Sequence, residues 1–267
     1  LKPLVLSGPS FAADVVAGLP TAITLASQDY ELAQSVAQAL STRSFRIYVS
    51  GDVKGVQIGG AVKNVLAIAV GICAGKGLGA SAQAALLARS FAELRRLAGV
   101  LGAEAETLFG LSGLGDLVLT CSSTQSRNFS LGQELGKGVD LQTILASRKA
   151  VSEGVHTAGV VRAIADSNNI EMPVCEAVAR IVSDGANVDD EIIQLLSRPL
   201  RAEHEELWFL TGVLTKTDMR TYGLLVVQIR TVQLFLGNAQ GKGGCGRRMG
   251  RHSQLSGAQQ YARHATG

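Results

Sequence analysis

Cysteine, proline and aromatic residues are scarce in this 267-residue sequence, and the few cysteines lie far apart, at Cys73, Cys121, Cys175 and Cys245. No two of them form a C-x-x-C pair, which argues against a zinc ribbon and against the disulfide framework of a small secreted domain. No segment near Leu1 combines the charged and apolar parts of a signal peptide. We therefore expect a cytoplasmic protein.

A large excess of one charge is also absent. The formal net charge is +3, and residues 1–202 carry 17 basic and 18 acidic side chains, so nucleic acid is not an expected partner. The longest apolar stretch, residues 56–72, contains Lys63 and Asn64, which would both be costly in a bilayer. We expect no membrane span, and the hydrophobic content of 46% is ample for a globular core.

The first fifty residues alternate between β-rich apolar runs and segments with helical spacing. Strands are expected at residues 2–7, 20–27 and 45–49, and helices at 11–17 and 31–40. This pattern is typical of an α/β sheet. Because the chain starts directly with strand-like sequence, we expect residues 1–50 to be the C-terminal remnant of a larger α/β domain.

Strand-like sequence almost disappears after Gly51, and residues 51–202 predict an all-helical second domain. A glycine-rich connection is expected at 110–116. Met172 and Pro173 should open one helix, and Val188 with Asp189 should cap the last one. The expected helices are one within 56–79, then 81–99, 128–136, 157–166, 174–184 and a last one that reaches Leu196.

Residues 203–267 differ from the rest of the chain. Their apolar segments lack helix caps, and the final part is rich in Gly, Arg, Gln and Ser, so we expect a poorly ordered tail. The string GKGGCG at 241–246 matches G-x-G-x-x-G, but no strand and helix surround it. Cys245, His252 and His264 have no standard metal-site spacing, so no metal site is expected.

Lys63 is the cation of the apolar stretch, and its neighbours one helical turn away include Gly59, Gly60 and Ala67. Small neighbours leave room for a ligand. Burial among valines and leucines would partly desolvate the amine and favour its neutral form, which could act as a base. The alternative is a lysine that extends from a buried helix to water.

A second candidate is GLGDLVLTCSSTQSRN, residues 113–128. It offers the Asp116 carboxylate and, at an expected helix start, a hydroxyl, a guanidinium and an amide from Ser126, Arg127 and Asn128. That combination is typical of a phosphate site. A serine-rich loop with a helix cap and a solvated arginine would produce the same pattern. A third candidate, residues 151–158, contains Glu153 before another helix.

These segments, in this order, resemble the bacterial-type NAD(P)-dependent glycerol-3-phosphate dehydrogenases. The resemblance covers roughly residues 1–203 and rests on the motifs SGPSFA at 7–12, GAVKN at 60–64, GLGDL at 113–117, SRN at 126–128, EG at 153–154 and SRPL at 197–200. It implies a Rossmann-type sheet followed by an all-α substrate domain of the 6-phosphogluconate dehydrogenase C-terminal-like type.

The resemblance also implies roles for single residues. Lys63 matches the family's proton acceptor for the C2 hydroxyl of glycerol 3-phosphate. The matching substrate ligands are Gly8, Ser10, Lys63, Asp116, Ser126, Arg127 and Asn128, and the matching cofactor contacts are Ala12, Arg127, Val151 and Glu153. The implied reaction interconverts sn-glycerol 3-phosphate and dihydroxyacetone phosphate with NAD or NADP and supplies glycerol phosphate for phospholipids.

The family's pyrophosphate-binding G-x-G-x-x-G turn does not precede Gly8 in this sequence. We therefore expect the chain to be a fragment that is inactive by itself. The many small residues of the helical part favour a homodimer. Two alternatives stay open: a β-hydroxyacid dehydrogenase, in which asparagine rather than Ala67 would stand four residues after the lysine, and a non-catalytic helical dimerisation fragment.

Overall fold

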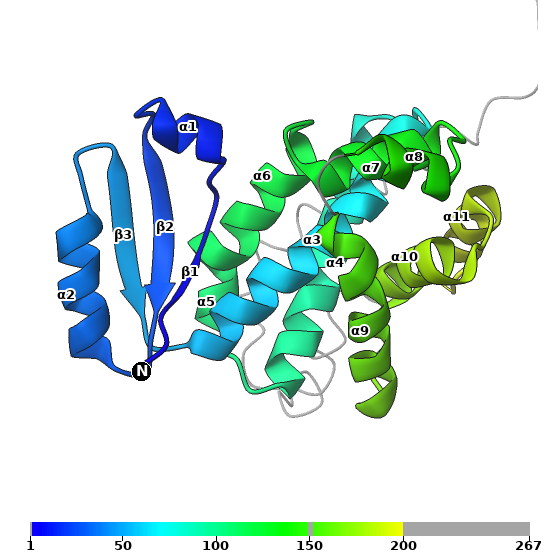
Figure 1. Ribbon diagram of the computed structural model, residues 1–267. Coiled ribbons are helices and arrows are strands. Elements are labelled where there is room, and N and C mark those ends of the chain that lie inside the picture. The colour runs from blue at the N-terminus through cyan, green and yellow to red at the C-terminus, as the bar shows by residue number, and fades with distance from the viewer. Residues whose placement is uncertain (1, 149–151, 200–267) are drawn as a thin grey trace, which may run out of the picture. The chain divides into compact units, whose positions relative to one another are not determined.

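A computed structural model of the chain describes residues 2–148 and 152–199, and residues 1–199 form one compact unit (Figure 1). The predicted tail, residues 203–267, with its G-x-G-x-x-G string and with Cys245, His252 and His264, lies outside the described residues. The division of the chain at residues 50 and 202 stays a prediction.

The N-terminal part is a three-stranded sheet in the order β1-β2-β3, with α2 beside it (Figure 1). Its elements are β1 (Val5–Ser7), α1 (Ala12–Val16), β2 (Thr21–Ala26), α2 (Tyr30–Leu40) and β3 (Phe45–Ser50). This order agrees with the strands and helices expected from sequence. The sequence did not indicate strand direction: β2 and β3 are parallel, whereas β1 and β2 are antiparallel.

Helix α2 covers one face of this sheet. The Asp29 carboxylate accepts a hydrogen bond of 3.0 Å from the Leu32 N–H and so caps the start of α2. Ala33 and Ala37 then pack against Leu25 of β2. This small apolar cluster is separate from the main core, which lies in the helical part.

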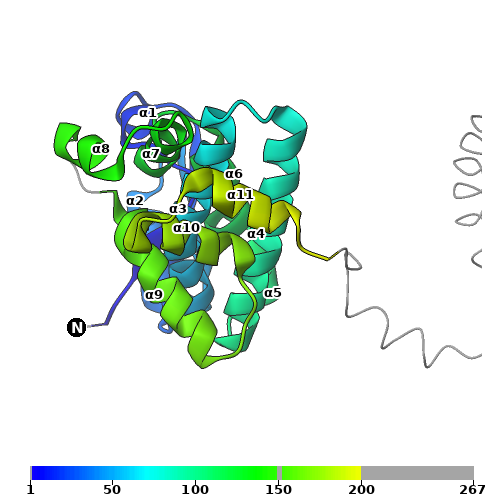
Figure 2. The same ribbon diagram turned by 90° about the vertical axis from the view of Figure 1, so that its right-hand side faces the viewer.

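The main core is built around α3 (Val53–Gly75), the helix that carries Lys63. Asp52 begins it by accepting a hydrogen bond of 2.8 Å from the Gly55 N–H, and its other oxygen accepts one of 2.9 Å from the Glu104 N–H. The side view shows the other helices around α3 (Figure 2). They include α4 (Ala80–Val100), α6 (Asp116–Ser122), α7 (Arg127–Gly136), α9 (Glu153–Ser167) and α10 (Pro173–Asp184).

Glycines allow α3 and α7 to approach closely. A Cβ atom on Gly71 of α3 would lie 2.2 Å from the Phe129 carbonyl oxygen, and one on Gly132 of α7 would lie 2.2 Å from the Ile68 carbonyl oxygen. Larger residues would therefore force the two helices apart. This packing fixes the start of α7, with its arginine, beside the middle of α3.

Two local expectations were wrong, and two short helices were not expected. The glycine-rich segment 110–116 is not a plain connection, because it contains a π-helical turn (Leu111–Gly115) that leads into α6. The unexpected helices are α5 (Ala105–Phe109), which precedes this turn, and α8 (Leu141–Ser147), which follows α7. The cap of α11 (Val188–Leu196) is not Val188 with Asp189 but Asn187, whose Oδ1 accepts from the Asp189 and Asp190 N–H groups.

By length and composition, α3 could cross a membrane, but 67% of its most apolar window is buried inside the structure. The core helix of a soluble protein passes the same test, so this finding is weak evidence for a span. Cys73, Cys121 and Cys175 are buried thiols without disulfide bonds. Among the described residues, no group of three His, Cys, Asp or Glu side chains converges on a possible metal site.

Candidate active site

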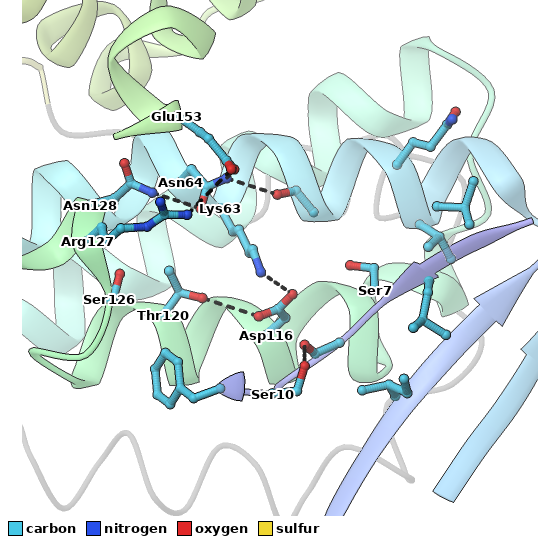
Figure 3. A pocket seen from close by; sticks show the side chains of 18 of the residues that line it. Ser7, Ser10, Lys63, Asn64, Asp116, Thr120, Ser126, Arg127, Asn128 and Glu153 are labelled. Atoms are coloured by element: carbon cyan, nitrogen blue, oxygen red, sulfur yellow. Dashed lines mark hydrogen bonds and ion pairs between the residues drawn. The ribbon is translucent and has the colours of Figure 1, made fainter. Parts of the chain in front are cut away.

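A cleft of about 630 Å³ lies where β1, the start of α1 and the helices α3, α6, α7 and α9 meet. Figure 3 shows its charged and polar side chains converging from these elements. Most of the sequence-predicted ligands line it, namely Gly8, Ser10, Lys63, Asp116, Ser126, Arg127, Asn128 and Glu153. Segments more than a hundred residues apart thus form one site.

Lys63 and Asp116 form an ion pair at this cleft (Figure 3). The Lys63 side chain is 20% exposed, whereas that of Asp116 is 2% exposed. Thr120, one turn further along α6, donates a hydrogen bond of 3.2 Å to the other carboxylate oxygen of Asp116. The carboxylate is therefore held from two sides, by Lys63 and by Thr120.

This pairing gives Lys63 a neighbour that the sequence did not indicate. The sequence placed the amine among apolar and small neighbours. The structure adds the buried carboxylate of Asp116 as its ion-pair partner. Asp116 is 53 residues away in sequence, so helical periodicity could not reveal the contact.

Burial raises the pKa of Asp116 above its usual value. The charge of Lys63 and its hydrogen bond, the Thr120 hydroxyl and the Gly8 backbone N–H all oppose that shift. The cost of desolvating a carboxylate is thus only partly offset by its partners. Such a carboxylate next to a cleft is typical of functional sites.

The other end of the cleft is formed by the start of α7. Ser126 caps this helix, because its hydroxyl oxygen accepts a hydrogen bond of 3.2 Å from the Phe129 N–H. Arg127 follows as the first helical residue, and its guanidinium lies 3.6 Å from the Glu153 carboxylate in an exposed ion pair. Such pairs are weak in water, so a ligand anion could compete for this arginine. A helix start and a guanidinium together favour an anionic group.

One of the four predicted cofactor contacts is not part of this arrangement. Ala12 lies exposed on α1 and is not among the residues that line the cleft. Val151 lies outside the described residues. The other two, Arg127 and Glu153, face each other at the start of α7 and α9, where a guanidinium and a carboxylate could bind phosphate and ribose hydroxyl groups.

Sequence reasoning missed two residues of the site. Thr120 follows Asp116 by four positions, so it lies on the same face of a helix, and this spacing could have indicated it. Asn64 was noted only as part of a motif and as a polar residue in the apolar stretch. It is buried beside the cleft and donates hydrogen bonds to the Gly60 carbonyl and to Glu153.

The fold and this cleft define a class of protein in which the end of an α/β sheet and a helical domain together enclose a lysine, a carboxylate and an arginine. A family model described as NAD-dependent glycerol-3-phosphate dehydrogenase C-terminus matches residues 52–193. The chain belongs to this family. The prediction that preferred this family over the β-hydroxyacid dehydrogenases is confirmed.

Individual relatives agree. The chain is 62% identical over 201 residues to a glycerol-3-phosphate dehydrogenase [NAD(P)+] of Hyphomonas neptunium, and 58% identical over 199 residues to one of Parvibaculum lavamentivorans. These matches cover 75% and 74% of the chain and 60% of each relative. The chain therefore spans about 60% of the length of these curated relatives.

A solved structure supports the same fold. The crystal structure of glycerol-3-phosphate dehydrogenase from Coxiella burnetii superposes with a TM-score of 0.71 at 43% identity. The match covers 73% of this chain and 60% of the Coxiella chain. The expected architecture, a sheet remnant followed by a helical domain, is therefore confirmed.

Proposed function

We propose that this chain provides the substrate-binding and proton-transfer half of an oxidoreductase that interconverts sn-glycerol 3-phosphate and dihydroxyacetone phosphate. The observation that carries the proposal is the single cleft that holds the Lys63–Asp116 ion pair near one end and the Arg127 guanidinium near the other. A hydroxyketone phosphate needs these two functions, a proton donor for its carbonyl and a cation for its phosphate.

In the direction of reduction, the Lys63 ammonium donates a proton to the C2 carbonyl oxygen of dihydroxyacetone phosphate. In the reverse direction, the neutral amine accepts the proton of the C2 hydroxyl. Asp116 holds the lysine against the cleft, and Thr120 holds Asp116. Because Asp116 is buried, its charge acts on the lysine through a medium of low polarity, where electrostatic effects are large.

Arg127 binds the phosphate at the start of α7, where the helix dipole adds to its charge. Gly8 and Ser10 form the opposite wall from the sheet side, and the Ser10 hydroxyl donates a hydrogen bond of 3.3 Å to the Gly8 carbonyl. NAD or NADP, when bound, exchanges hydride with C2 of the substrate. Arg127 and Glu153 are the described residues that would contact it.

The test joins the N-terminal part of the Hyphomonas relative to Leu1 and follows NADH or NADPH absorbance with dihydroxyacetone phosphate. The 267-residue chain alone should be inactive, because cofactor binding in this family depends on a Rossmann turn. The joined protein should be active. Turnover of a phosphate-free β-hydroxy acid instead would favour the alternative dehydrogenase class, and inactivity towards both substrates would contradict the proposal.

A cytoplasmic location and a homodimer remain part of this proposal. Sedimentation equilibrium of the joined protein checks the second point, since a monomer at all concentrations would exclude the dimer.

A further inference from the structure

Two buried asparagine amides in the lining of the cleft join three helices. Asn64 of α3 is 9% exposed, and Asn128 of α7 is 6% exposed. The Gly154 N–H, at the start of α9, donates to Asn128 Oδ1 at 3.0 Å, and Asn128 Nδ2 donates to Asn64 Oδ1 at 3.0 Å. Asn64 Nδ2 then donates to Glu153 Oε2 at 3.4 Å.

Because Glu153 and Gly154 are consecutive, these three hydrogen bonds form a closed circuit, which we call the amide ring. Each asparagine uses both its oxygen and its nitrogen in it, so the orientation of each amide is fixed by the other. Two of the three bonds are short and buried, where an unpaired amide would be costly. The ring therefore links α3, α7 and α9 at one point.

The amide ring requires a glycine at position 154. A Cβ atom at this position would lie 2.6 Å from the Asn64 carbonyl oxygen and 2.8 Å from Asn128 Oδ1. Both distances are too short for a carbon atom, so a side chain here would push the start of α9 out of the ring. By contrast, a Cβ atom on Gly159 of the same helix would meet only the Ser183 hydroxyl, at 3.9 Å.

Apart from Asp116, the charged residues of the cleft are sequence neighbours of the ring or belong to it. Lys63 precedes Asn64, Arg127 precedes Asn128, and Glu153 supplies a carboxylate oxygen (Figure 3). On an α-helix, consecutive side chains point about 100° apart, so one can turn into the junction while the next faces the cleft. A displacement of the ring would thus change the spacing between Lys63 and Arg127.

We propose that Asn64 and Asn128 are positioning residues, and that the amide ring sets the distance between the proton-transfer lysine and the phosphate-binding arginine. This inference rests on the proposed function, in which both cations act on one small substrate. A substrate bound at both ends tolerates little error, since a misplacement of about 1 Å can cost roughly a hundredfold in rate.

The first experiment needs no ligand. Hydrogen exchange of the full chain is compared for Gly154→Ala and for the matched control Gly159→Ala. We expect exchange in the first turn of α9 to be faster by roughly tenfold or more in Gly154→Ala, because its N–H loses the Asn128 acceptor, and to be unchanged in Gly159→Ala. Equal exchange in the two variants would overturn the ring.

The second experiment asks whether Asn64 acts through Arg127. The dissociation constant for sn-glycerol 3-phosphate is measured for the full chain, Asn64→Ala, Arg127→Ala and the double variant. We expect Asn64→Ala to weaken binding by about tenfold in the parent chain but by less than about twofold when Arg127 is already absent, because coupled residues are not additive. Equal losses in both backgrounds would assign Asn64 to a separate contact and overturn the proposal.

The two experiments also separate this inference from the proposed function. If the parent chain does not bind sn-glycerol 3-phosphate, the proposed substrate fails, and the exchange experiment still decides whether the ring holds α9. If Gly154→Ala does not fold, the binding cycle decides the inference, since it leaves Gly154 in place.

Discussion

Two carboxylates in different regions of the molecule are equally buried but have different partners. Asp116 of the cleft and Glu93 of α4 are each 2% exposed. Asp116 is paired with Lys63, whereas Glu93 accepts hydrogen bonds of 2.8 and 3.1 Å from the Val174 and Cys175 N–H groups at the start of α10. Within the described part of the chain, Glu93 has no ion pair.

Burial raises the pKa of both groups, and that of Glu93 reaches about 7. Backbone N–H groups can only hold a carboxylate, since they do not exchange protons with a ligand. Lys63, by contrast, lines the cleft, and in the proposed function it exchanges a proton with the substrate. A buried carboxylate therefore points to a reactive site when its partner can also reach a ligand. Among the described residues Glu93 has no such partner, and it joins α4 to α10 instead.

The largest expected effect is on activity, which should depend on Lys63 of the cleft but not on Glu93 of α4. In the joined enzyme, Lys63→Ala should lower kcat by about a hundredfold or more, because the proton donor is lost. Glu93→Gln, at a residue that does not line the cleft, should leave kcat close to its original value once the protein is folded. Steady-state kinetics with circular dichroism as a check on folding measures both, and a normal kcat for Lys63→Ala would return the lysine to a structural role.

The second effect concerns stability. The pKa of Glu93 rises from 4.5 to about 7 on folding, so its contribution to the free energy of unfolding is fully present below pH 4.5 and is lost as the pH rises to about 7. The difference amounts to about 3 kcal/mol. Denaturant unfolding across this pH range should show the loss in the parent chain and not in Glu93→Gln. Parallel pH profiles for the two proteins would contradict the assignment.

A smaller effect is expected at the other end of the cleft. Arg127→Lys replaces a planar guanidinium by a point charge, so the KM for dihydroxyacetone phosphate should increase by roughly tenfold while kcat changes less. An unchanged KM would remove Arg127 from the phosphate site. The same kinetic assay with Arg162→Lys serves as the control, because Arg162 pairs with Asp184 and does not line the cleft.

The smallest effect tests how Asp116 is held. Thr120→Val removes a hydrogen bond that lowers the pKa of Asp116, so this pKa should rise further. Carbon-13 NMR of the aspartate carboxyl groups can follow the titration, with Asp184 as an internal reference on the surface. A lower pKa for Asp116 in the variant would show that Thr120 does not hold the carboxylate.

The sequence predicted much of the fold because its elements have local signals. The alternation of strands and helices before Gly51, the helix around Lys63 and the helix that opens at Pro173 all follow from periodicity and capping residues. The prediction for the residues before Asp116 was wrong. These residues form a π-helical turn that packs against α3, but in the sequence its glycines look like those of a loop. The cap of α11 was missed by one residue, at Asn187.

The candidate site shows the same difference between local signals, which the sequence reveals, and long-range contacts, which it does not. The sequence by itself determined which residue types were available, a lysine in an apolar helix and an arginine at a helix start, because these depend on neighbours within one or two turns. Only the tertiary structure decided that Asp116 meets Lys63, that Asn128 receives the Gly154 N–H and that Glu93 holds α10. These contacts join residues 26 to 81 positions apart, and close packing of helices on α3, not local periodicity, brings them together.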